Sequence, residues 1–223
     1  MKNKYEIGTH VSERKYRQIL KLFSLDIPAL TTSKFMNMNY RTIHRLYTLW
    51  RLRIASLAME EMRPFCGEIE VDESYFGPTR VRGKRGRGAS HKIPVLGLHK
   101  RGERVFVSVV ENCSRSQLMP ILKGFILEKS DVYTDGWKAY DGILMKGFEH
   151  HRIHHHQNQF ARGKNHINGI ESFWSYAKFR LSKLRGIRRD FFFLHLKECE
   201  WRFNHRSDNI YAFLINNFSK FPL

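Results

Sequence analysis

Three strand-like segments in the middle of the chain limit its fold more than any other feature. The first, "EIEVDESYF" (68–76), alternates between apolar and polar side chains, which is the pattern of a β-strand. Two more β-type runs follow, "IPVLGLHK" and "RVFVSVVEN", and the tripeptide Arg101-Gly102-Glu103 between them is a hairpin signal. The central part of the chain is therefore predicted to form a β-sheet.

Helical and strand-like segments then alternate toward the C-terminus. "RSQLMPILKGFILEKS" is predicted to be helical, with Pro120 either in its first turn or at a kink. "DVYTDG" is expected to be a short buried strand, "WKAYDGIL" a short helix or turn, and "FEHHRIHHH" a further strand. "HINGIESFWSYAK" (166–178) has apolar residues at helical spacing, and "FFFLHLKECEWRFNHR" is expected to be the last helix. This order predicts a mixed α/β domain.

The chain is strongly basic. Lys and Arg number 39 against 21 Asp and Glu, which gives a formal net charge of +18. A folded basic protein most often binds a polyanion, here expected to be nucleic acid, although a solvated basic surface or binding to anionic membranes would also fit. A glycine-rich loop at 79–91 has no acidic residue and carries Arg80, Arg82, Lys84, Arg85 and Arg87. These side chains, and Lys183 in a second basic run, are expected to contact DNA.

Residues 1 to about 62 are predicted to be helical. Ser12 can cap one helix, Pro28 follows that helix, and a turn at 36–39 precedes Asn39, which can cap a longer helix. The outer face of the longer helix is expected to carry Arg41, His44, Arg45, Thr48 and Arg51. This layout favours a helix-turn-helix whose Arg41, His44 and Arg45 enter the major groove, although a helical bundle with a solvated basic face shows the same pattern. The predicted domains are 1–62, which binds DNA, and 63–223.

The sequence carries no sign of export. No apolar run reaches about eighteen residues, and the N-terminal segment has no hydrophobic region of the secretory type. Cys66, Cys113 and Cys199 are widely spaced and form neither a disulfide framework nor a CxxC metal motif. A cytoplasmic location in a reducing compartment is therefore expected.

Acidic residues in strand-like segments are unexpected in so basic a chain. Asp72 lies within the first strand and Asp135 ends "VYTD", although a buried carboxylate is costly unless it is paired or binds a metal. Taken singly, Asp72 could lie on a polar strand face, and Asp135 could be a turn residue before Gly136. Together with Glu171 on the later helix they form a set of oxygen ligands that suits Mg²⁺ or Mn²⁺. Two such ions, about 3.5–4 Å apart, support phosphodiester chemistry.

Four motifs point to a family. "VDESYFG", "YTDGWKAY", "HINGIESFWSYAK" and "WRFNHR", in this order, resemble bacterial insertion-sequence transposases of the DDE superfamily, in the ISXO-two-like branch. The resemblance implies a ribonuclease H-like catalytic domain in which Asp72, Asp135 and Glu171 are the metal-binding triad and Lys178 is the lysine that follows the Glu. It also implies a preceding helical DNA-binding domain. Many relatives carry a cysteine-rich zinc ribbon that this sequence lacks, so end recognition is expected to rest on the helix-turn-helix.

The resemblance also implies an activity and partners. The activity is metal-dependent cleavage of double-stranded DNA at the ends of the element, followed by strand transfer into target DNA. Because two ends are joined, a homodimer or larger assembly is expected. The alternatives are a non-catalytic DNA-binding protein derived from a transposase and a nuclease of the same fold.

Glu171 and Lys178 are expected to have separate tasks. They are about two helical turns apart, roughly 10 Å along the axis, on nearly the same side of the helix. This is too far for a mutual salt bridge but suits a metal ligand beside a group that holds phosphate. The simpler alternative is that Lys178 is a solvated lysine.

A histidine-rich run and three further acids are rival candidates. The run contains His150, His151, His154, His155 and His156. Clustered histidines can bind Zn²⁺, but the run itself contains no Cys or carboxylate to complete a ligand set, so some of these residues are expected to contact phosphates instead. The resemblance implies that His156 is the best candidate, because it matches the strand-end histidine of the family. The three acids are Glu68, Glu70 and Glu73. Glu70 has the strand parity of Asp72 and could assist the site, although an ion-paired or solvated role is expected for it.

Overall fold

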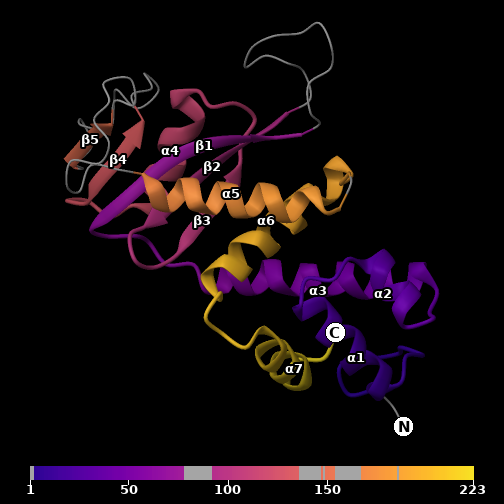
Figure 1. The fold of residues 1–223 in the computed structure, drawn as a ribbon. Coiled ribbons are helices and arrows are strands. Elements are labelled where there is room, and N and C mark those ends of the chain that lie inside the picture. Colours follow the sequence, from indigo (N-terminus) through magenta and orange to yellow (C-terminus); the bar gives the residue numbers. More distant parts are fainter. Residues whose placement is uncertain (1–2, 78–91, 136–146, 148, 154–166, 185) are drawn as a thin grey trace, which may run out of the picture. The chain divides into compact units, whose positions relative to one another are not determined.

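A computed structural model describes residues 3–77, 92–135, 147, 149–153, 167–184 and 186–223 (Figure 1). The chain forms two compact units, one made of Met1–Glu60 with Lys197–Leu223 and the other of Glu61–Leu196. The expected division was 1–62 and 63–223, and the structure differs in grouping the C-terminal residues with the N-terminal helices.

The second unit contains a five-stranded mixed sheet. Its strands are β1 (Glu68–Phe76), β2 (Ile93–Lys100), β3 (Val105–Val109), β4 (Asp131–Asp135) and β5 (Glu149–Ile153). Their order is β3-β2-β1-β4-β5, with antiparallel pairing among β1, β2 and β3 and parallel pairing of β4 with β1 and β5. With helices α4 (Arg115–Phe125) and α5 (Asn168–Ser182), this confirms the predicted ribonuclease H-like α/β architecture.

The two faces of the sheet have different chemistry because side chains alternate along each strand. Ile69 and Val71 of β1 belong to an apolar core with Leu118 and Leu122 of α4. The opposite face of β1 carries acidic side chains, and α5 crosses it over β1 and β2 (Figure 1). Pro120 lies in the interior of α4, past its first turn.

The first unit is helical, as predicted. Its N-terminal helices are α1 (Glu13–Ser24), α2 (Ala29–Phe35) and α3 (Tyr40–Glu60). Asn39 caps α3, since its Oδ1 accepts the Arg41 backbone N–H at 2.8 Å, whereas the Ser12 side chain makes no capping bond to α1.

The C-terminal part of this unit is α7 (Ile210–Lys220), which the sequence patterns did not predict, and the end of α6 (Arg189–Asn204). Leu214 and Phe218 of α7 are buried in one core with Tyr16 and Trp50. The chain ends are also paired, because the Ile7 N–H donates to the Leu223 carbonyl.

The prediction that Arg51 lies on the basic outer face of α3 is wrong. It is only 7% exposed, and its Nε donates to Oε2 of Glu198 at 2.7 Å. Glu198 also accepts from Nε of Arg202 at 2.9 Å. Arg51 therefore belongs to a buried ion network rather than to a DNA-facing surface.

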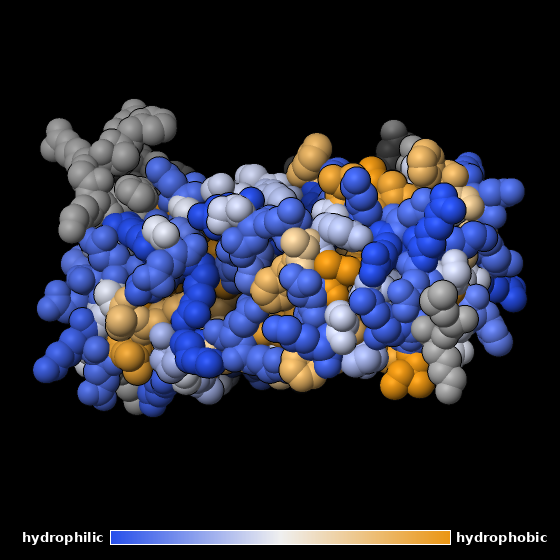
Figure 2. Space-filling view, turned by 90° about the horizontal axis from the view of Figure 1, so that it is seen from below, coloured by the Kyte–Doolittle hydropathy of each residue, from blue (hydrophilic) through white to orange (hydrophobic). Residues whose placement is uncertain are grey.

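One face of the molecule is largely polar. Figure 2 shows hydrophilic residues over most of the visible face, with hydrophobic residues scattered among them. Within the described part of the chain, none of the helices has the combination of length and apolar character that crossing a bilayer requires.

Candidate active site

Asp72 and Asp135 occupy neighbouring positions on adjacent parallel strands. Val71 of β1 pairs with Thr134 of β4, so the next residue of each strand is one of the two aspartates. Paired residues of parallel strands point to the same face, and here it is the face that α5 covers over β1 and β2. The strand register thus places two carboxylates from distant parts of the sequence side by side.

Trp174 of α5 contacts Asp72 directly. Its indole Nε1 donates to Oδ2 of Asp72 at 3.0 Å. The residue opposite Asp72 on β2 is Gly97, where a Cβ would lie 2.5 Å from the Trp174 ring and 2.8 Å from Cδ1 of Ile170. A residue without a side chain at position 97 therefore lets α5 approach the sheet closely enough for this hydrogen bond.

Glu70 anchors the start of α5. This carboxylate is 1% exposed and accepts the Ile170 backbone N–H at 2.9 Å through Oε2. Nε of Arg101 donates to its Oε1 at 3.1 Å, and Nδ1 of His99 lies 3.3 Å from Oε2. Because Glu171 directly follows Ile170, this contact also sets the position of the third predicted metal ligand, whose side chain is exposed.

The charges of Asp135 and Glu171 affect the acidity of Asp72. Burial, with the negative charges of Asp135 and Glu171, raises the pKa of Asp72 to about 6 against the opposing hydrogen bonds from the Glu73 backbone and Trp174. A bound cation would favour the ionised form of a buried carboxylate, such as Asp72, that is close to two further negative charges. The oxygen donors present fit Mg²⁺ or Mn²⁺.

Lys178 lies farther along α5, close to Phe76 at the end of β1. Its side chain is exposed, and Nζ is 5.9 Å from the ring centroid of Phe76. Phe76 is four residues beyond Asp72 on β1, on the same face. Lys183 is also exposed, with Nζ 5.2 Å from the ring centroid of Phe179.

The predicted DNA contacts of the helical unit differ in their surroundings. Arg41 and His44 are exposed on α3. Arg45 is partly exposed, but its guanidinium forms an ion pair with Glu6. A DNA contact by Arg45 would therefore have to replace this internal partner.

Several predicted DNA contacts lie outside the described residues: Arg80, Arg82, Lys84, Arg85, Arg87 and His156. Of the histidine run, His150 and His151 lie on β5 and point to opposite faces of the sheet. Nε2 of His150 is 2.8 Å from Oγ1 of Thr134, and Nε2 of His151 is 2.7 Å from Oδ1 of Asp131.

Sequence reasoning assigned no site role to Trp174 and left that of Glu70 open. Trp174 was part of an apolar stripe, and its N–H contact with Asp72 joins residues 102 positions apart. Glu70 was expected to be ion-paired or solvated. The structure confirms the ion pairing, with burial in place of solvation, and adds the contact with the Ile170 N–H. The strand parity shared by Glu70 and Asp72 was the available signal.

Comparison with known proteins identifies a family. Residues 64–204 match the family described as the ISXO2-like transposase domain. An "Uncharacterized transposase-like protein" of Haemophilus influenzae is 44% identical over 102 residues, which cover 46% of this chain and 82% of that protein. An "Uncharacterized protein in transposable element ISH50" of Halobacterium salinarum is 32% identical over 173 residues, which cover 70% of this chain and 57% of that protein. The chain therefore belongs to the ISXO2-like transposase family.

Proposed function

We propose that this chain is the transposase of an insertion sequence, and that it cleaves DNA at the element ends and joins the freed ends to target DNA. The observation that carries the proposal is the register of β1 and β4, in which Asp72 and Asp135 follow the paired residues Val71 and Thr134 on the face covered by α5, the helix that carries Glu171. Burial, and after it the charges of Asp135 and Glu171, raise the pKa of Asp72 to about 6. Carboxylates repel DNA phosphates, so their use at a DNA-processing site requires bound cations.

Asp72, Asp135 and Glu171 would hold the Mg²⁺ or Mn²⁺ ions. When bound, these ions activate the attacking oxygen and stabilise the leaving oxygen. The carboxylate oxygens of these three residues would together supply the protein ligands of the ions. The Trp174 N–H orients Asp72 through Oδ2, and Glu70 holds the helix that carries Glu171.

The reaction consists of two phosphoryl transfers. In the first, water attacks the phosphodiester at the element end, the P–O3′ bond breaks, and a 3′-OH is released. In the second, that 3′-OH attacks a target phosphodiester, forming a new P–O bond as the target's own P–O3′ bond breaks. Neither transfer requires a covalent bond to the protein.

Basic side chains would hold the DNA. Lys178 is proposed to position the DNA end beside the metal ligands, since its ammonium lies over Phe76 on the strand that carries Asp72. Phosphates would be contacted by Lys183, His156 and the basic residues of 79–91. The element ends would be contacted by Arg41 and His44, which are exposed, and by Arg45 once its ion pair with Glu6 is released. A homodimer or larger assembly would bring two ends together.

The test uses Asp72→Asn, Asp135→Asn and Glu171→Gln, with Glu103→Gln as an exposed acidic control. Each triad variant should lose roughly 10³-fold in the rate of Mg²⁺-dependent nicking, because metal ligation supplies several kcal/mol and about 1.36 kcal/mol is tenfold in rate. Gel shifts on the same duplex, taken from the DNA flanking the gene, should remain at control level.

Strand transfer from a pre-nicked end distinguishes the alternatives. Joined products support a transposase, and nicking without joining indicates a nuclease. Nicking at the control rate in any triad variant would remove that residue from the site, and binding without cleavage by the unaltered chain would indicate a DNA-binding protein alone.

A further inference from the structure

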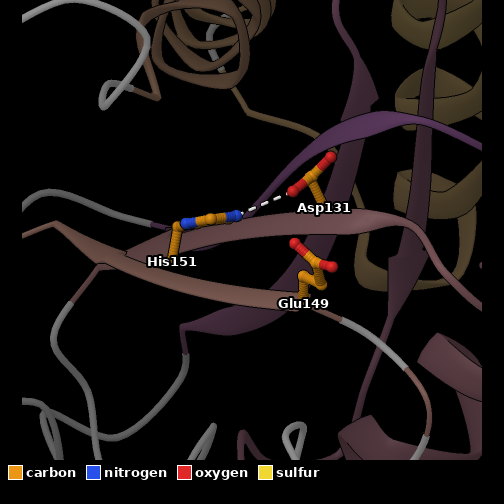
Figure 3. A group of neighbouring side chains, drawn as sticks. All are labelled: Asp131, Glu149 and His151. Atoms are coloured by element: carbon orange, nitrogen blue, oxygen red, sulfur yellow. Dashed lines mark hydrogen bonds and ion pairs between the residues drawn. The ribbon is translucent and has the colours of Figure 1, made fainter.

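A second group of side chains able to bind a metal lies at the far end of β4 from Asp135. Asp131, Glu149 and His151 each offer one ligand atom, and these atoms all lie within 4.8 Å of one another. Figure 3 shows the three side chains converging from two adjacent strands. Asp131 begins β4 and Asp135 ends it, so about 13 Å of strand separates this cluster from the candidate active site.

Strand register, rather than a loop, holds the cluster together. Asp131 pairs with Glu149, and Tyr133 pairs with His151, in the parallel ladder of β4 and β5. Because alternate residues share a face, all four side chains project to the same side of the sheet. Their backbones therefore keep the three donors adjacent in the absence of any ion.

The ring of His151 is held in a fixed orientation. It stacks on Tyr133 with centroids 4.7 Å apart and an interplanar angle of 18°. Arg101 covers the Tyr133 ring, with Cζ 3.8 Å from the ring centroid, and the Tyr133 hydroxyl donates to Glu68 at 3.3 Å. Supporting contacts of this kind orient the ligands of metal sites.

The negative charges around the cluster also favour a bound cation. Glu68, Asp131 and Glu149 are register neighbours across β1, β4 and β5, and like charges directly across strands are destabilising. Arg101 lies 3.8 Å from Glu68, and His151 bonds Asp131. The Glu149 carboxylate has no hydrogen-bond or ion-pair partner among the residues that the structure describes.

We propose that Asp131, Glu149 and His151 form a second divalent-cation site, of the nitrogen–oxygen type that Zn²⁺ favours. The cation would replace the hydrogen bond between His151 and Asp131, with Nε2 of neutral His151 and one oxygen from each carboxylate as ligands. Any proton on Nε2 would be released to solvent on binding. Since β5 is an edge strand of the sheet, the ion would join it to β4 and has a structural role.

The experiment uses the full chain carrying Asp72→Asn, Asp135→Asn and Glu171→Gln, so that the proposed catalytic metals do not contribute. Zn²⁺ binding is measured by titration calorimetry, and the melting temperature is measured with and without Zn²⁺. In this background His151→Gln is compared with His150→Gln, a matched control on the same strand but the opposite face.

The parent and His150→Gln should bind one more Zn²⁺ per chain than His151→Gln, or bind it at least about tenfold more tightly. Zn²⁺ should raise the melting temperature only of the two proteins that keep the site. Glu149→Gln, a change at an exposed side chain, repeats the test if His151→Gln does not fold. Equal binding and equal melting shifts in all variants, or equal loss in His150→Gln, would overturn the proposal.

Discussion

Glu70 and Asp72 lie on one face of β1, but their pKa values are shifted in opposite directions. For Glu70, burial favours the neutral form, but the hydrogen bonds from His99, the Ile170 N–H and Arg101 outweigh it, and the pKa is lowered. For Asp72, burial and the neighbouring carboxylates raise the pKa to about 6. Glu70 is therefore suited to a permanent structural charge, and Asp72 to a charge that a bound cation completes.

Asp72 should destabilise the metal-free fold at neutral pH. Its folded pKa of about 6 lies above its ordinary value of 3.8, so the folded state binds the proton more tightly and stability falls as the pH rises from about 4 to about 6. Without metal at pH 7.5, Asp72→Asn should raise the free energy of unfolding by roughly 1–3 kcal/mol.

Urea denaturation in the presence of EDTA measures this effect. The gain should be much smaller near pH 4, where Asp72 is protonated in the folded state and partly protonated in the unfolded chain, and added Mn²⁺ should stabilise the unaltered chain more than Asp72→Asn. The same gain at pH 4 and pH 7.5 would contradict the charge argument.

At the scale of elements, the position of α5 depends on two contacts with β1. Glu70 binds the first turn of the helix, and Asp72 accepts from Trp174 one turn later. Both contacts require α5 to lie close to the sheet. Gly169 allows this approach, because a Cβ at this position would lie 2.1 Å from Nδ1 of His99. The helix that carries Glu171 is therefore positioned by polar contacts as well as by its apolar stripe.

Glu70→Gln should lower the free energy of unfolding by about 3–5 kcal/mol, because it leaves the Arg101 charge without its buried partner. The matched control is Glu68→Gln, whose side chain is 32% exposed and faces the same arginine at 3.8 Å, and about 0–1 kcal/mol is expected there. Urea denaturation at pH 7 compares the two. A cost for Glu70→Gln no larger than for Glu68→Gln would show that the anchor contributes little.

At the scale of the molecule, the end of the chain completes the N-terminal helical unit. Phe218 stacks on Trp50 with ring centroids 6.4 Å apart, and both are fully buried. Arg202 donates to the carbonyls of Phe23 and Ser24 at the end of α1. The unit that carries the proposed DNA-reading helix is therefore assembled from both ends of the sequence.

Phe218→Ala should accordingly destabilise the helical unit by about 3–5 kcal/mol, the usual cost of removing a buried aromatic ring. Phe221→Ala, three residues later and 58% exposed, should change stability by less than about 0.5 kcal/mol. Denaturation followed by tryptophan fluorescence, to which Trp50 and Trp201 of this core contribute, measures the effect. Equal effects of the two substitutions would mean that α7 is not part of this core.

Local patterns in the sequence determined the strands, most of the helices and the triad candidates. β1 alternates because one face packs on α4, and α3 shows helical spacing because Ile43, Leu46 and Trp50 enter one core. Asp72 and Asp135 were noticeable because carboxylates are rare in such strands. These features depend on neighbours within a few residues, which periodicity records.

Only the tertiary structure decided which distant residues meet. Arg51 and Glu198 are 147 positions apart, so helical periodicity could not show that this arginine turns inward to a buried carboxylate. The pairing of Asp131 with Glu149 and His151 depends on β4 and β5 lying side by side in one register, which no single strand's pattern specifies. Periodicity assigns a side chain to a face of its own element, whereas its partner depends on how the elements pack, and that packing is set by the whole chain at once.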